Sequence, residues 1–477
     1  MNRLCECVPD TDPTRISACF EAQKGRALQL RTSSAAQRIA SLKRLQKALV
    51  AARPALYQAF VEDFGKPELE VELTEILPVL EEIAHAIRHL RQWMRPRRVG
   101  MTITSLGSAA RIEYQPRGRC LIIGPWNYPV ATVIAPLVSA IGAGNTVICK
   151  PSEYTPAVNA VLAQVLSAVF TADTVVLIEG GVATATALLA LPFDHIFFTG
   201  SPAVGRIVMT AAARHLTSVT LELGGKSPAV VDESADLERA AELLLWGKLI
   251  NAGQSCIAPD HVFVHRRVRE AFVEACKVIL VARHGAQTSD LARIIDHSHA
   301  ERMAELIEDA QACGVPLLWG GQYDIDRCHV APTLFGAPIN AARIGHEEIF
   351  GPLLPIIEFD HLEEVVAQIN AGPKPLALYI WSQSRRVARR LLAVTSSGGA
   401  CINHCMQQYT QCKLPFGGVN HSGMGSSHGI HGFRAFSHER AVLTGGAFLP
   451  IRWLFAPYTP TRMKLARCIS MLASRFG

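Results

Sequence analysis

The sequence has 477 residues, of which 49% are hydrophobic and 18% are charged. This length allows two or three domains with substantial cores, and the composition excludes a disordered chain. The formal net charge of +6 is modest and is spread along the chain without interleaved basic and aromatic stretches, so nucleic-acid binding is not expected.

The first ten residues, MNRLCECVPD, lack the apolar stretch of a secretory signal. No run of roughly 18 apolar residues predicts a membrane span. We therefore expect a cytoplasmic protein whose 13 cysteines are reduced thiols. The pairs Cys5/Cys7 and Cys401/Cys405 have no second pair at zinc-site spacing, so no metal site is expected.

Apolar residues at helical spacing predict helices from residue 14 to about 98. The next segment alternates β-branched and polar residues around Gly107, which predicts an antiparallel hairpin. From residue 119, short apolar runs such as CLIIGP and NTVICKP alternate with helix candidates, and Thr155 and Pro156 are suited to be the cap and first residue of one helix. This pattern predicts a doubly wound α/β domain, followed by a second α/β cycle to about residue 400.

The motif FFTGSPAVG is typical of an anion-binding helix start. A strand ends at Gly200, Ser201 can cap the helix, and Gly205 permits close packing of its first turn. The alternative is an ordinary strand-to-helix turn, because the motif is not the G-x-G-x-x-G fingerprint.

Two further strand ends carry polar side chains. Lys150 and Glu153 in KPSEYTP could bind the hydroxyls of a ribose, although a solvated surface pair is the alternative. Asn127 in GPWNYP could donate its amide to a developing oxyanion, or it could serve only the turn before a proline.

Glu222 and Cys256 are the candidate base and nucleophile. Glu222 lies between leucines in LELGGKSP, so partial desolvation should raise its pKa and make it a usable general base, unless it is a structural carboxylate held by backbone amides. Cys256 lies among small residues in NAGQSCIAPD, and the default interpretation of such a cysteine is a small buried hydrophobe.

Seven motifs, taken together and in their order along the chain, favour the functional interpretation of these residues over the structural one. They are PWNYP, KPSEYTP, FFTGSPAVG, LELGGKSP, GQSCIAPD, EEIFGPLLPI and LPFGGVNHSGMG. Over nearly the whole chain the sequence resembles the aldehyde dehydrogenase superfamily. WGKLINAGQSCIAPD and SHGIHGFRAFSH resemble its class 3 branch of fatty, aromatic and coniferyl aldehyde dehydrogenases.

The resemblance implies a role for each matching position. Cys256 is then the nucleophile, Glu222 the general base and Asn127 the oxyanion donor, acting with the backbone N–H of Cys256. The implied cofactor contacts are Trp126, Lys150 and Glu153, the pyrophosphate turn of Gly200, Ser201 and Gly205, and Glu348 and Phe350 at the nicotinamide ribose and ring. Trp246 and Tyr128 are implied near the substrate.

The changes of pattern along the chain predict the domain boundaries, and the resemblance implies what each domain does. A Rossmann-like NAD-binding domain is expected from residues 1–98 and 119–221, and an α/β catalytic domain from 222–400. Residues 99–118 and 401–440 are expected to form a small β-hairpin element for bridging and oligomerisation, and 441–477 a C-terminal tail.

The implied reaction is NAD(P)-dependent oxidation of an apolar aldehyde to the carboxylic acid through a cysteine thiohemiacetal and thioester. The alternatives are a CoA-acylating dehydrogenase, an NADPH-dependent acyl reductase, or a non-catalytic binding protein on the same fold. Glu222 argues against the CoA-acylating alternative, because those relatives generally lack it.

Cofactor and partners follow from the same resemblance. NAD is expected, with NADP possible, and a homodimer is favoured over other assemblies. The tail mixes basic and apolar residues, so it could contact an anionic membrane, or pack across the partner subunit or the substrate entrance. The sequence departs from class 3 members at Asn420, His421, Ser426 and Ser427, which leaves the substrate and the subunit contact open.

Overall fold

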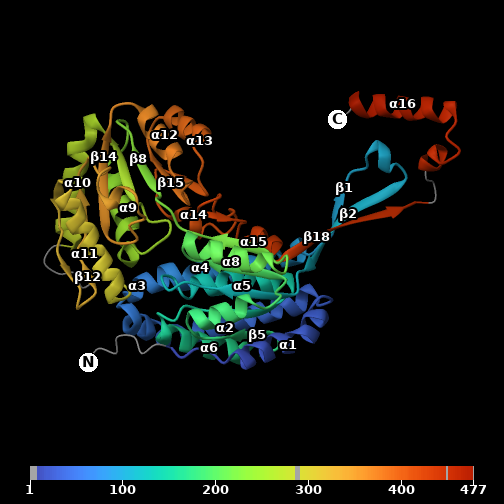
Figure 1. Ribbon diagram of the computed structural model, residues 1–477, viewed down its shortest axis with the longest axis horizontal. Helices are drawn as coiled ribbons and strands as arrows, with labels where there is room; N and C mark the ends of the chain where they lie inside the picture. The colour runs from blue at the N-terminus through green and yellow to red at the C-terminus, as the bar shows by residue number, and fades with distance from the viewer. Residues whose placement is uncertain (1–7, 285–289, 447–449, 476–477) are drawn as a thin grey trace.

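The computed structural model of the protein describes residues 8–284, 290–446 and 450–475. Two α/β units, each built on a mainly parallel sheet, lie beside one another, and a small antiparallel sheet extends away from them (Figure 1). This arrangement confirms the α/β fold class expected from the sequence.

The first unit contains a six-stranded sheet with the order β17-β7-β6-β3-β4-β5. Its strands are β3 (Arg119–Ile123), β4 (Thr146–Lys150), β5 (Val175–Leu177), β6 (His195–Thr199), β7 (Ser218–Glu222) and the antiparallel β17 (Gly423–Met424). The chain order runs outward in both directions from β3, which creates a switch point between β3 and β6. Ligands of doubly wound sheets bind at the carboxyl ends of the strands beside such a point.

Helices cover both faces of this sheet. One face carries α5 (Ala131–Ala143) and α6 (Pro156–Val169), backed by the long helices α2 (Ala35–Phe64) and α4 (Leu77–Trp93). The other face carries α1 (Pro13–Leu30), α7 (Val182–Leu189) and α8 (Pro202–Ala213). The strands are consequently buried on both sides, which explains their continuous apolar sequences.

The second unit contains a seven-stranded sheet with the order β10-β13-β14-β9-β8-β15-β16. Its strands are β8 (Pro228–Val231), β9 (His261–His265), β10 (Leu317–Trp319), β13 (Thr333–Phe335), β14 (Leu353–Phe359), β15 (Ala377–Trp381) and β16 (Gly399–Ile402). Helices α9 (Leu237–Leu249), α10 (Arg269–His284) and α11 (His297–Ala312) pack on one face, and α12 (Leu362–Ala371) and α13 (Arg385–Val394) pack on the other. A separate two-stranded sheet joins β11 (Tyr323–Asp324) and β12 (His329–Val330).

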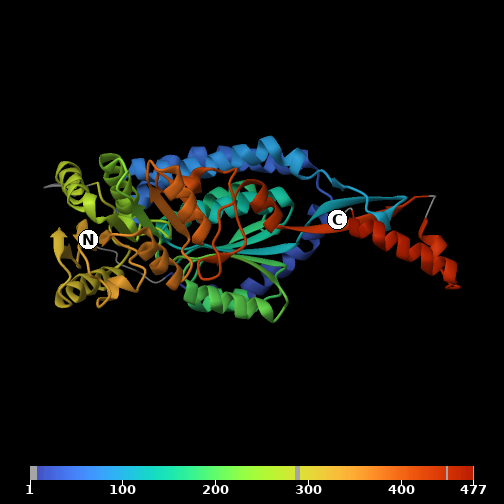
Figure 2. The same cartoon turned by 90° about the horizontal axis from the view of Figure 1, so that it is seen from above.

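The predicted hairpin is part of a three-stranded antiparallel sheet. β1 (Arg97–Val99) and β2 (Ser108–Pro116) form the hairpin, and β18 (Ser437–Gly445) pairs with β2 along nine residue pairs. The hairpin therefore gains its third strand from more than 300 residues further along the chain. The terminal helix α16 (Pro460–Arg475) lies beyond this sheet, away from both α/β units (Figures 1 and 2).

Short helices and helical turns connect the longer elements. They are α3 (Glu68–Val71), the π-helical turn η1 (Glu72–Ile76), α14 (Gln407–Thr410), α15 (Gly429–Ala435) and the 3-10 turns η2 (Ile103–Ser105), η3 (Ile250–Gly253), η4 (Arg266–Val268), η5 (Arg343–Gly345) and η6 (Pro450–Leu454). Among the described residues, every helix is too short or too polar to cross a membrane.

One local prediction was wrong. Helix α6 begins at Pro156 as expected, but the side chain of Thr155 does not cap it and instead contacts Ser152 and Asn159. Asp63 of α2 accepts from the N–H groups of Ala157 (3.1 Å) and Val158 (2.9 Å) instead. A distant carboxylate thus replaces the local cap, which no local sequence pattern can reveal.

Candidate active site

Four parallel strands of the first sheet end at the same edge. Asn127 follows β3, Lys150 ends β4, Gly200 follows β6 and Glu222 ends β7. Because all four strands point the same way, residues from four separate motifs meet at one edge of the sheet. Cys256 approaches this edge from the second unit, on the loop between η3 and β9.

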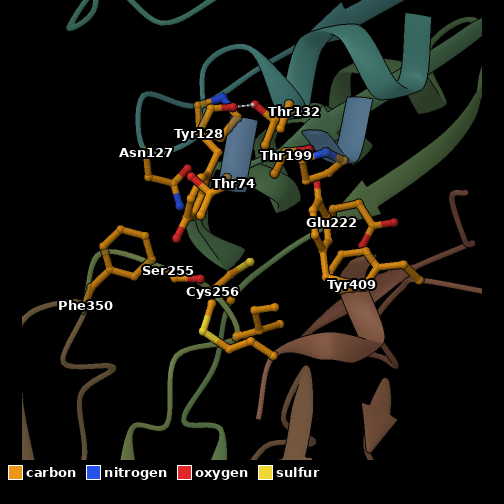
Figure 3. A pocket seen from close by; sticks show the side chains of 18 of the residues that line it. Thr74, Asn127, Tyr128, Thr132, Thr199, Glu222, Ser255, Cys256, Phe350 and Tyr409 are labelled. Atoms are coloured by element: carbon orange, nitrogen blue, oxygen red, sulfur yellow. Dashed lines mark hydrogen bonds between the residues drawn. The ribbon is translucent and has the colours of Figure 1, made fainter. Parts of the chain in front are cut away.

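A cavity of about 580 Å³ lies at this edge, and its lining is predominantly apolar. Eight of the predicted catalytic and cofactor-binding residues line it, namely Trp126, Asn127, Gly200, Ser201, Glu222, Cys256, Glu348 and Phe350. Tyr128 and Trp246 line it too, whereas Lys150, Glu153 and Gly205 lie outside the lining. In the view of Figure 3, Asn127 and Glu222 lie on opposite sides of Cys256.

A sharp turn presents Cys256 to the cavity. After α9, Asn251 and Ala252 adopt left-handed φ angles of 53° and 52°, and Gly253 follows with 76°. The side-chain amide of Asn251 donates to the carbonyl oxygens of Asn127 (2.9 Å) and Gln254 (3.2 Å). These bonds fix an unusual backbone turn and tie the cysteine loop to the asparagine loop.

Cys256 is half-buried as a residue, but its thiol group is desolvated. Burial raises its pKa from 9.0 to about 12, and the nearby carboxylates of Glu348 and Glu222 act in the same direction. The thiol is therefore protonated at neutral pH in the protein alone. Its use as a nucleophile requires a base or a change of environment when ligands bind.

The Asn127 side chain is buried and held by one hydrogen bond. Its Nδ2 donates to the carbonyl of Gln254 at 3.0 Å, and its Oδ1 has no partner among the described residues. An amide nitrogen carries two protons, so the second N–H can donate to a ligand beside Cys256.

The Glu222 carboxyl is buried, and neither oxygen has a hydrogen-bond partner within the described ranges. Burial raises its pKa well above the ordinary value, an effect that the nearby hydroxyl of Ser427 opposes. The Ser427 hydroxyl itself donates to the carbonyl of Phe416 at 3.2 Å. The expected desolvation of Glu222 is confirmed, and such a carboxyl can take a proton near neutral pH.

Helix α8 provides an N-terminus beside the cavity. Ser201 caps it by accepting from the N–H of Val204 at 3.3 Å, and Pro202 occupies the first turn, as predicted. A side chain at Gly205 would place its Cβ 2.7 Å from Leu223, so glycine lets α8 pack against the segment that follows β7. The arrangement suits an anionic ligand at the helix start.

Lys150 and Glu153 form a pair at the end of β4. Lys150 is buried, and its Nζ lies 2.9 Å from a carboxylate oxygen of Glu153, which is half-buried. This burial excludes the solvated surface pair that the sequence left open. The N–H of Gly181, beside Glu153, is held by Asp10 at 2.8 Å, so the N-terminal segment helps to form this corner.

Glu348 and Phe350 lie on the loop before β14. Burial raises the pKa of Glu348 to about 7, and the N–H of Gly225 opposes this shift. Phe350 has a left-handed φ of 54° and packs edge-on against Trp126, with ring centroids 5.6 Å apart. The rings of Phe350 and Trp126 together form an apolar wall of the cavity.

Much of the wall opposite Trp126 and Phe350 was not predicted from the sequence. Tyr409, Phe416 and His428 line it and contact one another edge-on, with ring centroids 5.0 to 5.4 Å apart. Burial lowers the pKa of His428 to about 4, which keeps its ring neutral. These residues come from an irregular segment after β16, so no periodic pattern marks them. Leu73 and Thr74 of η1 line the same cavity.

The two-sheet architecture, with a cavity at the switch point of the first sheet, is typical of enzymes that bind a dinucleotide. The profile of the aldehyde dehydrogenase family matches residues 3–442. The chain belongs to the aldehyde dehydrogenase family.

Several known proteins are similar over most of the chain. A putative aldehyde dehydrogenase of Bacillus subtilis is 39% identical, with 91% of this chain and 98% of that protein covered. A dimeric NADP-preferring aldehyde dehydrogenase of Rattus norvegicus is 38% identical, with 95% and 98% covered. A probable coniferyl aldehyde dehydrogenase of Pseudomonas aeruginosa is also 38% identical, with 94% and 95% covered.

Solved structures agree with this assignment. The substrate-bound state of a Staphylococcus aureus aldehyde dehydrogenase superposes with a TM-score of 0.90 at 36% identity, covering 96% of this chain and 99% of that one. A Mycobacterium tuberculosis aldehyde dehydrogenase complexed with NAD⁺ superposes with a TM-score of 0.84 at 26% identity, covering 93% and 92%.

Proposed function

We propose that this enzyme oxidises apolar aldehydes, medium- or long-chain aliphatic or aromatic, to carboxylic acids through a thioester on Cys256. The observation that carries the proposal is the apolar cavity in which Cys256, Asn127 and Glu222 meet. An aldehyde bound there leaves its hydrocarbon part among apolar walls and its carbonyl beside the three polar groups.

Cys256 forms the first covalent bond. Once its thiol proton has been released to solvent, its sulfur attacks the carbonyl carbon, and the resulting thiohemiacetal carries negative charge on oxygen. The free N–H of the Asn127 amide and the backbone N–H of Cys256 donate to that oxygen. Such a donor typically contributes about 3 to 4 kcal/mol to the transition state.

Glu222 completes the reaction. Loss of hydride from the former aldehyde carbon leaves a thioester on Cys256. Glu222 then takes a proton from water, whose oxygen attacks the thioester carbon, and the C–S bond breaks to release the acid and regenerate the thiolate. The raised pKa of Glu222 supports this role, because a carboxylate with a higher pKa is a stronger base.

The residues around the cavity fit a nicotinamide dinucleotide. The N-terminus of α8 suits the pyrophosphate, the Lys150–Glu153 pair suits the adenosine ribose, and the Trp126–Phe350 wall suits a flat ring. When bound, the nicotinamide accepts the hydride of the aldehyde carbon. Glu348, on the same loop as Phe350, is proposed to hold the adjoining ribose.

Assembly and surface contacts are part of the proposal. The name of the rat relative states that it is dimeric, which supports a homodimer for this chain. The tail offers exposed Trp453, Phe455 and Leu472 beside basic Arg462 and Arg467. A contact with an anionic membrane through this tail is the second proposed surface.

Initial rates on a panel of aldehydes, each with NAD and with NADP, test the proposed substrate class. From butanal to decanal, kcat/KM should rise about fourfold per methylene until the cavity is filled, since each buried CH₂ contributes about 0.8 kcal/mol. Benzaldehyde should also be oxidised faster than glyceraldehyde. A preference for short polar aldehydes would contradict the proposal. Release of acyl-CoA in the presence of CoA would favour the CoA-acylating alternative.

A further inference from the structure

Three charged side chains lie beneath the candidate site on one short segment between α2 and α4. Lys66 and Glu75 are fully buried and form an ion pair, with Lys66 Nζ 3.1 Å from Glu75 Oε1. Glu70 is half-buried. Burial raises the pKa of its carboxyl, and the positive charge of Lys66 partly opposes this shift. None of the three lines the cavity, so none can touch the substrate there.

Glu75 holds the asparagine side of the site. Its second oxygen accepts from the N–H groups of Val130 (3.2 Å) and Ala131 (2.9 Å), at the start of α5. These residues follow Asn127 by three and four positions. Lys66 Nζ lies 4.2 Å from the ring centroid of Tyr128, the residue after Asn127. The ion pair therefore fixes the turn that carries Asn127.

Glu70 holds the cysteine side. Its carboxylate accepts from the N–H of Asn251 at 2.9 Å. The Asn251 amide in turn donates to the carbonyl oxygens of Asn127 and Gln254, and Gln254 precedes Cys256 by two residues. One segment thus holds both loops that carry the two proposed oxyanion donors.

The π-helical turn η1 lets one short segment face both the cavity and the buried Lys66. Within Glu72–Ile76, the side chains of Leu73 and Thr74 line the cavity while Glu75 points inward to Lys66. Such turns shift the direction of the side chains that follow them and occur often at functional sites.

We propose that Lys66, Glu70 and Glu75 are positioning residues that set the separation between the Asn127 amide and the backbone N–H of Cys256. The inference rests on the proposed oxyanion role of these two donors. Donors aimed at a developing charge must be held within about 0.5 Å of their productive positions, and a displacement of about 1 Å can cost a hundredfold in rate. Because a buried ion pair often contributes little net stability, a positioning role is the contribution that the following variants test.

Two double variants isolate the effect of Glu75. Lys66→Met with Glu75→Leu, and Lys66→Met with Glu75→Gln, both remove the buried charges, but only glutamine keeps an acceptor for the two N–H groups of α5. The leucine variant should lower kcat by about tenfold or more, with KM for NAD changed less than about twofold. The glutamine variant should lose less. Equal kcat in the two variants would overturn the inference.

Arg38 of α2 supplies a matched control, because it contacts the opposite end of α5 from Glu75. Its buried guanidinium donates to the carbonyl of Gly142 at 3.0 Å, near the C-terminus of α5. Arg38→Met should lower the melting temperature but change kcat by less than about threefold. A loss of kcat as large as that of the leucine variant would mean that any loosening of α5 slows the enzyme, which would overturn the inference.

A double-mutant cycle with Asn127→Ala shows whether the cluster acts through Asn127. In the Asn127→Ala enzyme, the leucine double variant should lower the remaining kcat by less than about twofold. A second full loss would overturn the inference. An Asn127→Ala enzyme with normal kcat would instead refute the oxyanion role itself, so the two failures are distinguishable.

Glu70→Ala provides the same test if the leucine double variant does not fold. The half-buried position tolerates this change more easily, and it removes the acceptor for the Asn251 N–H. It should lower kcat with little change in KM for NAD, and this loss should likewise shrink in the Asn127→Ala enzyme. An unchanged kcat, or a loss that is fully additive, would overturn the inference.

Discussion

Cys256 should be a slow nucleophile in the enzyme without ligands. Its pKa is about 12, compared with 9.0 for the same group before burial. The three-unit difference lowers the thiolate fraction roughly a thousandfold at pH 8, because each unit is a factor of ten. The thiolate fraction should then grow about tenfold for each unit of pH up to about pH 11.

Alkylation by iodoacetamide measures this directly, since the thiolate is the reacting form. The rate at Cys256 is followed by mass spectrometry of its peptide between pH 6 and 10, with N-acetylcysteine in the same solution as the reference thiol. Cys256 should react far more slowly than the reference and show no plateau in this range. A plateau near pH 7 or 8 would refute the conclusion that burial keeps the thiol protonated. Saturation with NAD shows whether the cofactor changes the rate.

Three further predictions test the cofactor site, the nucleophile and the tail. Glu153→Gln should raise the ratio of kcat/KM with NADP to that with NAD by at least about fivefold, because it removes a charge that repels a 2′-phosphate; an unchanged ratio contradicts the proposed ribose contact. Cys256→Ala should abolish aldehyde oxidation while NAD still binds within about twofold of its normal affinity, as measured by fluorescence titration; residual turnover would exclude Cys256 as the nucleophile. Removal of residues 458–477 should reduce sedimentation with anionic liposomes at low salt, and equal sedimentation of the two forms would exclude the membrane contact.

The sequence predicted the parts of the site that lie at strand ends. Glu222, Gly200 and Lys150 each follow an apolar run with a parallel partner, so local patterns place them at one edge of the sheet. The desolvation of Glu222 was also predictable, because Leu221 and Leu223 flank it and both are buried.

Contacts between distant segments were not predictable in the same way. From the sequence alone, Lys66 and Glu75 would be taken for two solvated charges. They are buried because α5 packs against them. His428 likewise lines the cavity from the N-cap position of α15, a short helix that packs against α4 and α5 of the first unit. Tertiary contacts of this kind leave no periodic signal in one sequence.

The domain boundaries and the individual roles of the site residues remain predictions. The small antiparallel sheet shows why boundaries are difficult to derive from local patterns. Its third strand, β18, is separated from β2 by both α/β units, so no single stretch of sequence contains the whole element.

The Glu222→Gln enzyme provides the most direct test of the thioester mechanism. Mixed rapidly with NAD and a good aldehyde substrate, it should release about one NADH per active site and then stall, because the acyl group stays on Cys256 when water is not activated. Intact-protein mass spectrometry of the stalled enzyme should show the mass of one acyl group. Turnover at the normal rate, or a burst without an adduct on Cys256, would contradict the account.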